Sequence, residues 1–348
     1  MKKANLIIPL AVVLCACTHK KDPSASVPDM NAVRANLAFT CTHESEHLPP
    51  LDPKADIVFQ YARYLQKTNG PRNFDDILRY YRIAAAYGHY KANENAQLLI
   101  SQGLALSPEG AKEAVRLAEQ LVEQGVPGGY YDIGHYLETG YGLKQDADTS
   151  LRYFRKAADL GSPDAQYYVG DLLAPIDKAP AIAKQMRECA TEQGYGKAAS
   201  ILGIDLKTDG FYPEALKVFQ KGVSAGSAQS ASFLEHGFTG PPESDRLYYL
   251  ALPNDPERSR RYEVIWKFLD DNESRNPKIP DIDAIVPLPP AKLPPWNGTF
   301  QWQNEQDAAI PPQQPSDELI EQLAKAKNLD PTTGLPLAGL SGKTPAKD

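Results

Sequence analysis

The sequence predicts an all-α fold, a right-handed α/α solenoid of helical-hairpin repeats that ends in a proline-rich, mostly irregular C-terminal arm. Short segments that end in glycine recur through the middle of the chain, at Gly88, Gly125, Gly161, Gly194 and Gly226. The intervals between these glycines are 37, 36, 33 and 32 residues, and each holds two helix-length stretches, as in a helical-hairpin repeat. Of the 30 prolines in the chain, 13 lie between Pro277 and Pro345, where a helical solenoid cannot continue.

Residues 1–16 are predicted to be a secretory signal. A basic start at Lys2 and Lys3 precedes an apolar run over residues 6–16, which is shorter than the roughly 20 residues that span a bilayer. The sequence at residues 14–17, Leu-Cys-Ala-Cys, resembles the lipobox of bacterial lipoprotein signals, which implies lipid attachment at Cys17. An ordinary secretory signal that ends near a cysteine is the alternative. Thr18 is not the aspartate of an inner-membrane retention signal, so we expect lipid anchoring to the bacterial outer membrane, facing the periplasm.

Residues 17–52 are predicted to form a lipidated tether, because they are polar and interrupted by prolines. The formal net charge of the whole chain is −7. An acidic surface argues against binding to nucleic acid or to anionic lipid. The membrane is therefore expected to be contacted through the lipid anchor only.

Two cysteines, Cys41 and Cys189, remain once Cys15 is removed with the signal and Cys17 carries lipid. An oxidising periplasm permits a disulfide between them, but the sequence cannot place them within bonding distance. Two independent cysteines are the favoured interpretation, and a single disulfide is the alternative.

The solenoid is predicted over residues 53–272. In its clearest unit, residues 129–138 and 148–160 are helical, and Gly161 ends the second helix. Ser162 can cap the next helix, and Pro163 suits its first turn. Small residues near the middle of successive first helices would let a neighbouring helix come close: Gly134, Gly170 and Gly203. One hairpin cannot bury its apolar face alone, so neighbouring hairpins must stack.

This unit resembles the Sel-one-like repeat, a relative of the tetratricopeptide repeat. The matching residues are Gly134, Gly140, Gly142-Leu143, Asp146, Tyr153 and the run Lys-Ala-Ala-Asp-Leu-Gly at residues 156–161. The resemblance implies an adaptor or scaffold solenoid that presents a concave surface to a protein partner. We expect the partner to bind the concave face of the middle repeats.

The C-terminal segment, residues 273–348, is predicted to be mostly irregular. Prolines 287, 289, 290, 294 and 295 favour an extended conformation. Residues 299–302 alternate as a short strand would, and residues 316–328 are predicted to form a short amphipathic helix. Residues 279–296 resemble a C-terminal segment of repeat-containing lipoproteins, some of which accompany phospholipase effectors of type VI secretion. Trp296, Phe300 and Trp302 could contact a partner. The favoured alternative is that the arm packs on the last repeat of its own solenoid.

Two short motifs match catalytic patterns in residue type but not in their predicted structural context. Residues 43–47 fit H-E-x-x-H, but Pro49 and Pro50 follow at once and the flanking sequence is polar and typical of a loop. A plain linker is the favoured interpretation, and adventitious metal capture by Cys41, His43 and His47 is the alternative. Residues 222–226 fit G-x-S-x-G, yet Ser224 falls at the end of a predicted repeat helix instead of between a strand and a helix. We therefore predict no enzyme activity, no catalytic residues, no cofactor and no metal.

The sequence supports two functions. The first is an immunity protein that binds and inhibits a phospholipase-type toxin of type VI secretion in the periplasm. The second is an envelope scaffold that organises cell-envelope proteins. The partner is accordingly a secreted toxin or an envelope protein.

Overall fold

The computed structural model describes residues 37–68 and 70–337. The predicted signal peptide and Cys17 lie outside the described residues, as does most of the predicted tether. The described residues from Phe39 to residue 337 belong to one compact unit. Within the described part, no helix has the length and apolar character needed to cross a membrane.

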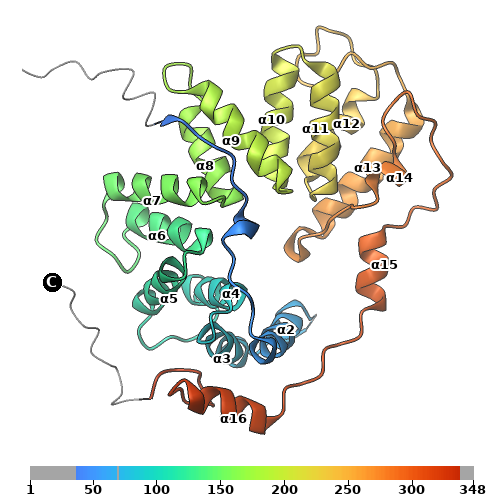
Figure 1. Ribbon diagram of the computed structural model, residues 1–348. Coiled ribbons are helices and arrows are strands. Elements are labelled where there is room, and N and C mark those ends of the chain that lie inside the picture. The colour runs from blue at the N-terminus through green and yellow to red at the C-terminus, as the bar shows by residue number, and fades with distance from the viewer. Residues whose placement is uncertain (1–36, 69, 338–348) are drawn as a thin grey trace, which may run out of the picture. The chain divides into compact units, whose positions relative to one another are not determined.

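Six helical hairpins follow one another along an arc in the described residues (Figure 1). The hairpins are α2 (Pro53–Lys67) with α3 (Phe74–Ala85), α4 (Tyr90–Ser101) with α5 (Ala111–Glu123), α6 (Pro127–Thr139) with α7 (Ala147–Asp159), α8 (Pro163–Leu173) with α9 (Pro180–Glu192), α10 (Gly196–Thr208) with α11 (Tyr212–Ser224), and α12 (Ala228–Gly237) with α13 (Pro256–Asp271). The predicted all-α solenoid is confirmed.

The recurring glycines end the hairpins, as the sequence predicted. All five have a positive φ, between 74° at Gly125 and 98° at Gly161, a conformation that glycine adopts without the steric penalty of a Cβ. The next helix then starts at a cap. At α8, the Ser162 hydroxyl accepts a hydrogen bond from the Ala165 amide over 3.2 Å, and Pro163 occupies the first helical position.

Close helix approach at the mid-helix glycines is also confirmed. A Cβ at Gly134 would lie 2.7 Å from the ring of Phe154, and a Cβ at Gly203 would lie 2.5 Å from the ring of Phe219. Both rings are fully buried. In these two hairpins, the second helix therefore places an aromatic ring where the first helix has no side chain.

We expect Gly203→Ala to lower the free energy of unfolding by up to about 2 kcal/mol. Alanine gains about 1 kcal/mol in helix propensity, but overpacking a filled core costs about 1–3 kcal/mol, and the Phe219 ring is fully buried. Gly170→Ala is the matched control, because its Cβ would meet its nearest atom at 3.4 Å. That variant should keep or gain stability. Equal denaturation midpoints for the two variants would contradict this account.

Three helices follow the solenoid: α14 (Ile282–Ile285), α15 (Gln301–Ala308) and α16 (Asp317–Ala326). Two 3-10 turns complete the described structure, η1 (Glu44–Glu46) and η2 (Glu273–Arg275). The predicted helix at 316–328 is confirmed, with the Ser316 hydroxyl capping the Leu319 amide over 3.3 Å.

The strand predicted at residues 299–302 is wrong, because α15 begins at Gln301. Among the described residues, the backbone offers no neighbouring strand there. Side-chain hydrogen bonds one helical turn apart instead join Gln301 to Glu305 over 2.7 Å and Gln303 to Asp307 over 2.6 Å. Local pairs of this kind stabilise a short helix.

Candidate protein-binding surface

The N-terminal segment, residues 39–52, lies along the inner side of the arc (blue in Figure 1). The prediction of a flexible tether is wrong for these residues. Cys41 and Cys189 form a disulfide with a Cα–Cα distance of 5.5 Å, so the interpretation of two independent cysteines is also wrong. The bond joins the segment to α9. Disulfides form and persist in oxidising compartments, which indicates a location outside the cytoplasm.

Hydrogen bonds hold the same segment beside the disulfide. The Gln193 side chain accepts from the Glu44 amide over 2.8 Å, and the Gln166 side chain donates to the Thr42 carbonyl over 3.0 Å. The chain passes so close to Gly161 that a Cβ there would lie 2.5 Å from the carbonyl carbon of His43. A polar segment can be ordered here because its backbone groups find partners on the solenoid.

The H-E-x-x-H residues do not form a zinc-binding helix. His43 and His47 flank the three-residue turn η1, and the His43 ring lies 3.9 Å from the Glu192 carboxylate. Among the described residues, Cys41, His43 and Cys189 are a group whose ligand atoms lie within 4.8 Å of one another. The two sulfur atoms are bonded to each other in this structure.

Four carboxylates from four elements gather on this inner surface, and we call them the inner carboxylate cluster. They are Glu44 of the N-terminal segment, Glu94 of α4, Asp132 of α6 and Asp164 of α8. The Glu94 carboxylate lies over the first turn of α6, where a Cβ on Gly128 would be 2.7 Å from its Oε1. No member of the cluster forms an ion pair with any described residue.

Electrostatics within the cluster is unfavourable for ionised carboxylates. Burial and the neighbouring Asp164 carboxylate raise the pKa of Glu44 to about 7. Burial and the other three carboxylates raise the pKa of Glu94 to about 8. Burial, with Asp164 and Glu44 nearby, raises the pKa of Asp132 to about 7. Lys91, the cation that opposes these shifts at Glu44 and Glu94, is exposed.

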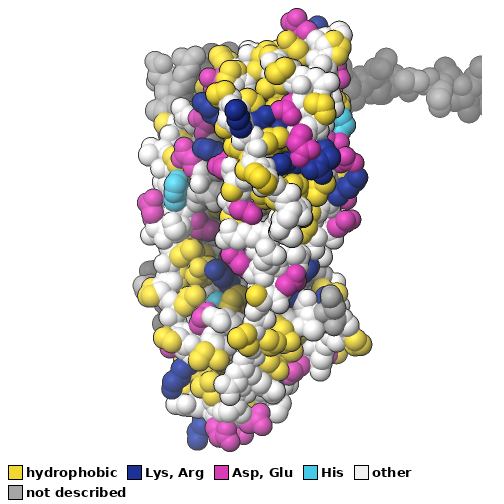
Figure 2. All heavy atoms as spheres, turned by 90° about the vertical axis from the view of Figure 1, so that its right-hand side faces the viewer, with side chains coloured by type: hydrophobic (Ala, Val, Ile, Leu, Met, Phe, Trp, Pro, Cys, Tyr) yellow, Lys and Arg dark blue, Asp and Glu magenta, His cyan; other side chains and the backbone are white. Residues whose placement is uncertain are grey.

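The outer surface differs from this inner one. Figure 2 shows the right-hand side of Figure 1, where acidic and basic side chains are interspersed among apolar ones. Charges of both signs are near one another on that face, as on an ordinary soluble surface.

The three aromatic residues of the C-terminal arm pack on the end of their own solenoid. Phe300 is 4% exposed and stacks on Phe268 of α13 at a centroid distance of 4.1 Å. The Arg261 guanidinium carbon lies 5.7 Å from the centroid of the Trp296 ring, and the Arg275 guanidinium carbon lies 5.2 Å from the centroid of the Trp302 ring. Phe300 is thus a core residue, and its prediction as a partner contact is wrong. The alternative, packing on the last repeat, is what the structure shows.

The arm then returns to the first hairpin. Ile320, Leu323 and Ala324 of α16 are buried in the core formed by α2, α3 and α4. The Tyr87 hydroxyl donates to the Leu323 carbonyl over 3.0 Å. The C-terminal segment therefore contacts both ends of the row of hairpins (Figure 1).

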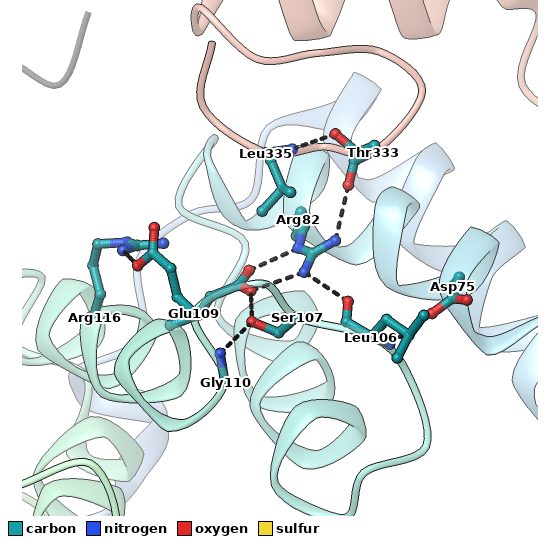
Figure 3. A network of polar contacts seen from close by, with 10 residues as sticks. Asp75, Arg82, Leu106, Ser107, Glu109, Gly110, Arg116, Thr333 and Leu335 are labelled. Atoms are coloured by element: carbon teal, nitrogen blue, oxygen red, sulfur yellow. Dashed lines mark hydrogen bonds and ion pairs between the residues drawn. The ribbon is translucent and has the colours of Figure 1, made fainter. Parts of the chain in front are cut away.

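A buried ion pair anchors the last described residues. Arg82 of α3 donates two hydrogen bonds to Glu113 of α5, over 2.7 and 2.8 Å (Figure 3). The same guanidinium donates to the carbonyls of Leu106 over 3.3 Å and of Thr333 over 3.0 Å. Ser107 completes the network with a 2.6 Å hydrogen bond to Glu113. One arginine thus joins two hairpins and the C-terminal segment.

Comparison with known proteins identifies the family. Three solved structures from Pseudomonas aeruginosa are similar to the chain. Pseudomonas aeruginosa 5086 (PA5086) is 32% identical, with a TM-score of 0.58 over 72% of this chain and 95% of that one. Immunity protein Pa5087 is 32% identical, with a TM-score of 0.58 over 73% and 95%. Immunity protein PA5088 is 30% identical, with a TM-score of 0.61 over 72% and 94%. The chain belongs to the family of these proteins.

Membership in the PA5086–PA5088 family agrees with the predicted resemblance, and the chain is a Sel-one-like repeat protein. A family model described as a domain of unknown function (DUF6396) matches residues 230–337. That range begins within α12 and includes the whole arm that packs on both ends of the solenoid. No protein with a curated description matches the chain.

The inner carboxylate cluster was missed in the sequence. Its members come from four elements, and Glu44 lies 120 residues before Asp164. Glu94, Asp132 and Asp164 all fall in the first half of the first helix of successive hairpins. They are not at equivalent repeat positions, since they follow Gly88, Gly125 and Gly161 by 6, 7 and 3 residues, so the repeat pattern alone does not align them.

Proposed function

We propose that this chain is an immunity protein that binds and inhibits a secreted toxin. The observation that carries the proposal is its relationship to immunity proteins Pa5087 and PA5088, at 32% and 30% identity over 95% and 94% of those chains. A repeat solenoid provides an extended surface for binding another protein. The protein acts by binding, and it performs no catalysis.

The location follows from the predicted anchor. A lipid on Cys17 would hold the protein on the outer membrane, facing the periplasm, where it meets a toxin before the membrane is damaged. The Cys41–Cys189 disulfide is consistent with that oxidising compartment. The resemblance of residues 279–296 to segments of lipoproteins that accompany phospholipase effectors makes a phospholipase-type toxin of type VI secretion the specific candidate.

The inner surface of the middle hairpins is the proposed binding face. The N-terminal segment covers part of the concave surface that the repeats alone would offer, and the disulfide keeps it there. Its exposed residues therefore become part of the binding face. Outside the segment, α4, α6 and α8 supply the remaining acidic side chains.

Affinity capture from secreted material with the tagged mature protein tests the proposal. We expect one stoichiometric hydrolase whose phospholipase activity on vesicles falls when the protein is added, and cells lacking the protein should be killed by that hydrolase. Cys17→Ser should inhibit the purified toxin equally well but protect cells poorly, because only the anchor is lost. Equal toxin sensitivity with and without the protein would refute immunity, and recovery of resident envelope proteins would favour a scaffold.

A further inference from the structure

The inner carboxylate cluster has no ion-pair partner among the described residues. The buried arginines Arg82 and Arg187, by contrast, are paired. Arg82 pairs with Glu113 at 2.7 Å, and Arg187 pairs with both Asp171 and Asp205 at 2.7 and 2.6 Å. Confining carboxylates together without partners disfavours their ionised forms. These four carboxylates therefore have a counter-charge to gain from outside.

A second observation points to the same conclusion. The Oδ2 atom of Asp132 is buried and has no hydrogen-bond partner. Buried polar atoms in native proteins nearly always have one, so an orphan at a binding surface marks a place for a ligand. Space for that ligand adjoins the cluster. A groove of about 570 Å³ begins at Asp164 and extends past Tyr195 and Ser227 to Lys278.

The arrangement suits basic side chains better than a metal ion. Calcium needs six to eight oxygen atoms at 2.3–2.6 Å. The four carboxylates do not form a compact ligand group of the kind found at Cys41, His43 and Cys189. Lysine and arginine carry their charge on long stems, and several of them can each reach a different carboxylate. An acidic surface also accelerates association with a basic partner.

We propose that the inner carboxylate cluster binds a basic segment of the partner protein, whose lysine or arginine side chains approach the cluster at Asp164, the one member that lines the groove. Glu44 completes the site, because the disulfide at Cys41 holds it there. The proposal rests on the proposed function for the identity of the partner as a toxin. The cation preference of the surface is a property of this chain alone.

The test compares Glu94→Gln/Asp132→Asn with Glu119→Gln/Glu123→Gln. Both double variants replace two carboxyl groups by amides, but Glu119 and Glu123 are exposed residues of α5 outside the cluster. The probe is a fluorescent peptide of alternating lysine and alanine, measured by anisotropy at pH 8 and about 50 mM salt, where screening is weak. We expect the cluster variant to bind about tenfold more weakly than wild type. The control variant should stay within about twofold.

Thermal stability supplies a readout that a merely structural role would not produce. The folded-state pKa values of Glu44, Glu94 and Asp132 lie above their ordinary values. The folded protein therefore binds more protons than the unfolded one, and stability from these groups is lost as the pH rises from about 4.5 through about 8. The cluster variant should melt higher than wild type at pH 8.5 while binding the peptide less well. A lower melting temperature would overturn the proposal.

The pH dependence of binding has the opposite sign. Lysine stays charged up to about pH 10, whereas Glu44, Glu94 and Asp132 ionise around pH 7–8. Peptide affinity should therefore rise from pH 6 to pH 8.5 in wild type and rise less in the cluster variant, which keeps only Glu44 of these three. Besides one another, the four carboxylates face Lys91 and the phenols of Tyr131, Tyr136 and Tyr195. Burial raises the pKa of each phenol, so none of the three ionises in this range.

The remaining outcomes separate this inference from the proposed function. If the cluster variant inhibits the captured toxin as well as wild type does, the inference fails and immunity stands. If no toxin is captured, immunity fails, and the peptide measurement alone decides the cation preference. The last measurement adds millimolar calcium. Calcium that stabilises wild type but not the cluster variant, and displaces the peptide, would show a metal site and overturn the proposal.

Discussion

Replacing Cys41 and Cys189 together by serine should lower the free energy of unfolding by about 5 kcal/mol. The disulfide closes a loop with a sequence separation of 148 residues. In the chain-entropy model, such a crosslink stabilises the folded state by restricting the unfolded chain, and the effect grows slowly with loop length. Equilibrium denaturation, monitored by helical circular dichroism, measures the loss. Dithiothreitol should bring wild type to the stability of the double variant.

A matched variant separates the covalent bond from the contacts around it. Gln193→Ala removes the 2.8 Å hydrogen bond from the Glu44 amide, together with those that Gln193 donates to the Gly161 carbonyl over 2.9 Å and to the Gln166 side chain over 3.0 Å, and leaves the disulfide in place. We expect it to lower stability by about 1–3 kcal/mol, because one hydrogen bond has a net value of about 1 kcal/mol. If the cysteine double variant loses no more than Gln193→Ala does, then the unfolded chain is not restrained by the crosslink.

Features that depend on residues close in sequence could be predicted, and features that depend on contacts between residues far apart in sequence could not. The hairpins were predictable because each is encoded locally. Gly161 ends one helix and Ser162 caps the next, and their neighbours in sequence are their neighbours in space. The helix at α16 was found for the same reason, from Ser316 and the acids that follow it.

The two terminal segments were not predictable, because their partners are distant in sequence. Residues 39–52 are polar and rich in proline, which is the composition of a linker. They are held by Cys189, Gln166 and Gln193 of the solenoid, and Phe39 packs against the core around Phe154. No local pattern encodes such contacts.

The C-terminal arm shows the same limit. Its proline content correctly excluded further hairpins, and packing on the last repeat was among the alternatives. The return of α16 to α3 was not predicted, since the Arg82 side chain and the Thr333 carbonyl lie 251 residues apart. The alternation at residues 299–302 suggested a strand. Phe300 alone supplies the buried apolar face, and the rest of that segment forms a helix.

Arg82→Ala should lower the free energy of unfolding by about 3–5 kcal/mol, because it leaves the Glu113 carboxylate buried without its partner. Arg82 is 7% exposed and Glu113 is 3% exposed, so water cannot replace the lost hydrogen bonds. The Thr333 and Leu106 carbonyls lose their donor at the same time. Release of the C-terminal segment should make the protein cleavable near residues 327–337. Denaturation and limited proteolysis measure the two effects.

The sign of the pH dependence shows whether the Arg82–Glu113 pair causes the loss of stability in Arg82→Ala. Burial alone would raise the pKa of Glu113, but the hydrogen bonds from Arg82 and Ser107 hold it below its ordinary value. Wild type therefore has the full contribution of the pair above about pH 4.5 and loses it as the pH falls further. In Arg82→Ala the buried Glu113 carboxylate is destabilising when ionised. The difference in the free energy of unfolding between variant and wild type should therefore become smaller in acid. Arg116→Ala breaks an exposed pair with Glu109 and should cost less than about 1 kcal/mol. Equal losses in the two variants would mean that the buried network does not fasten the arm.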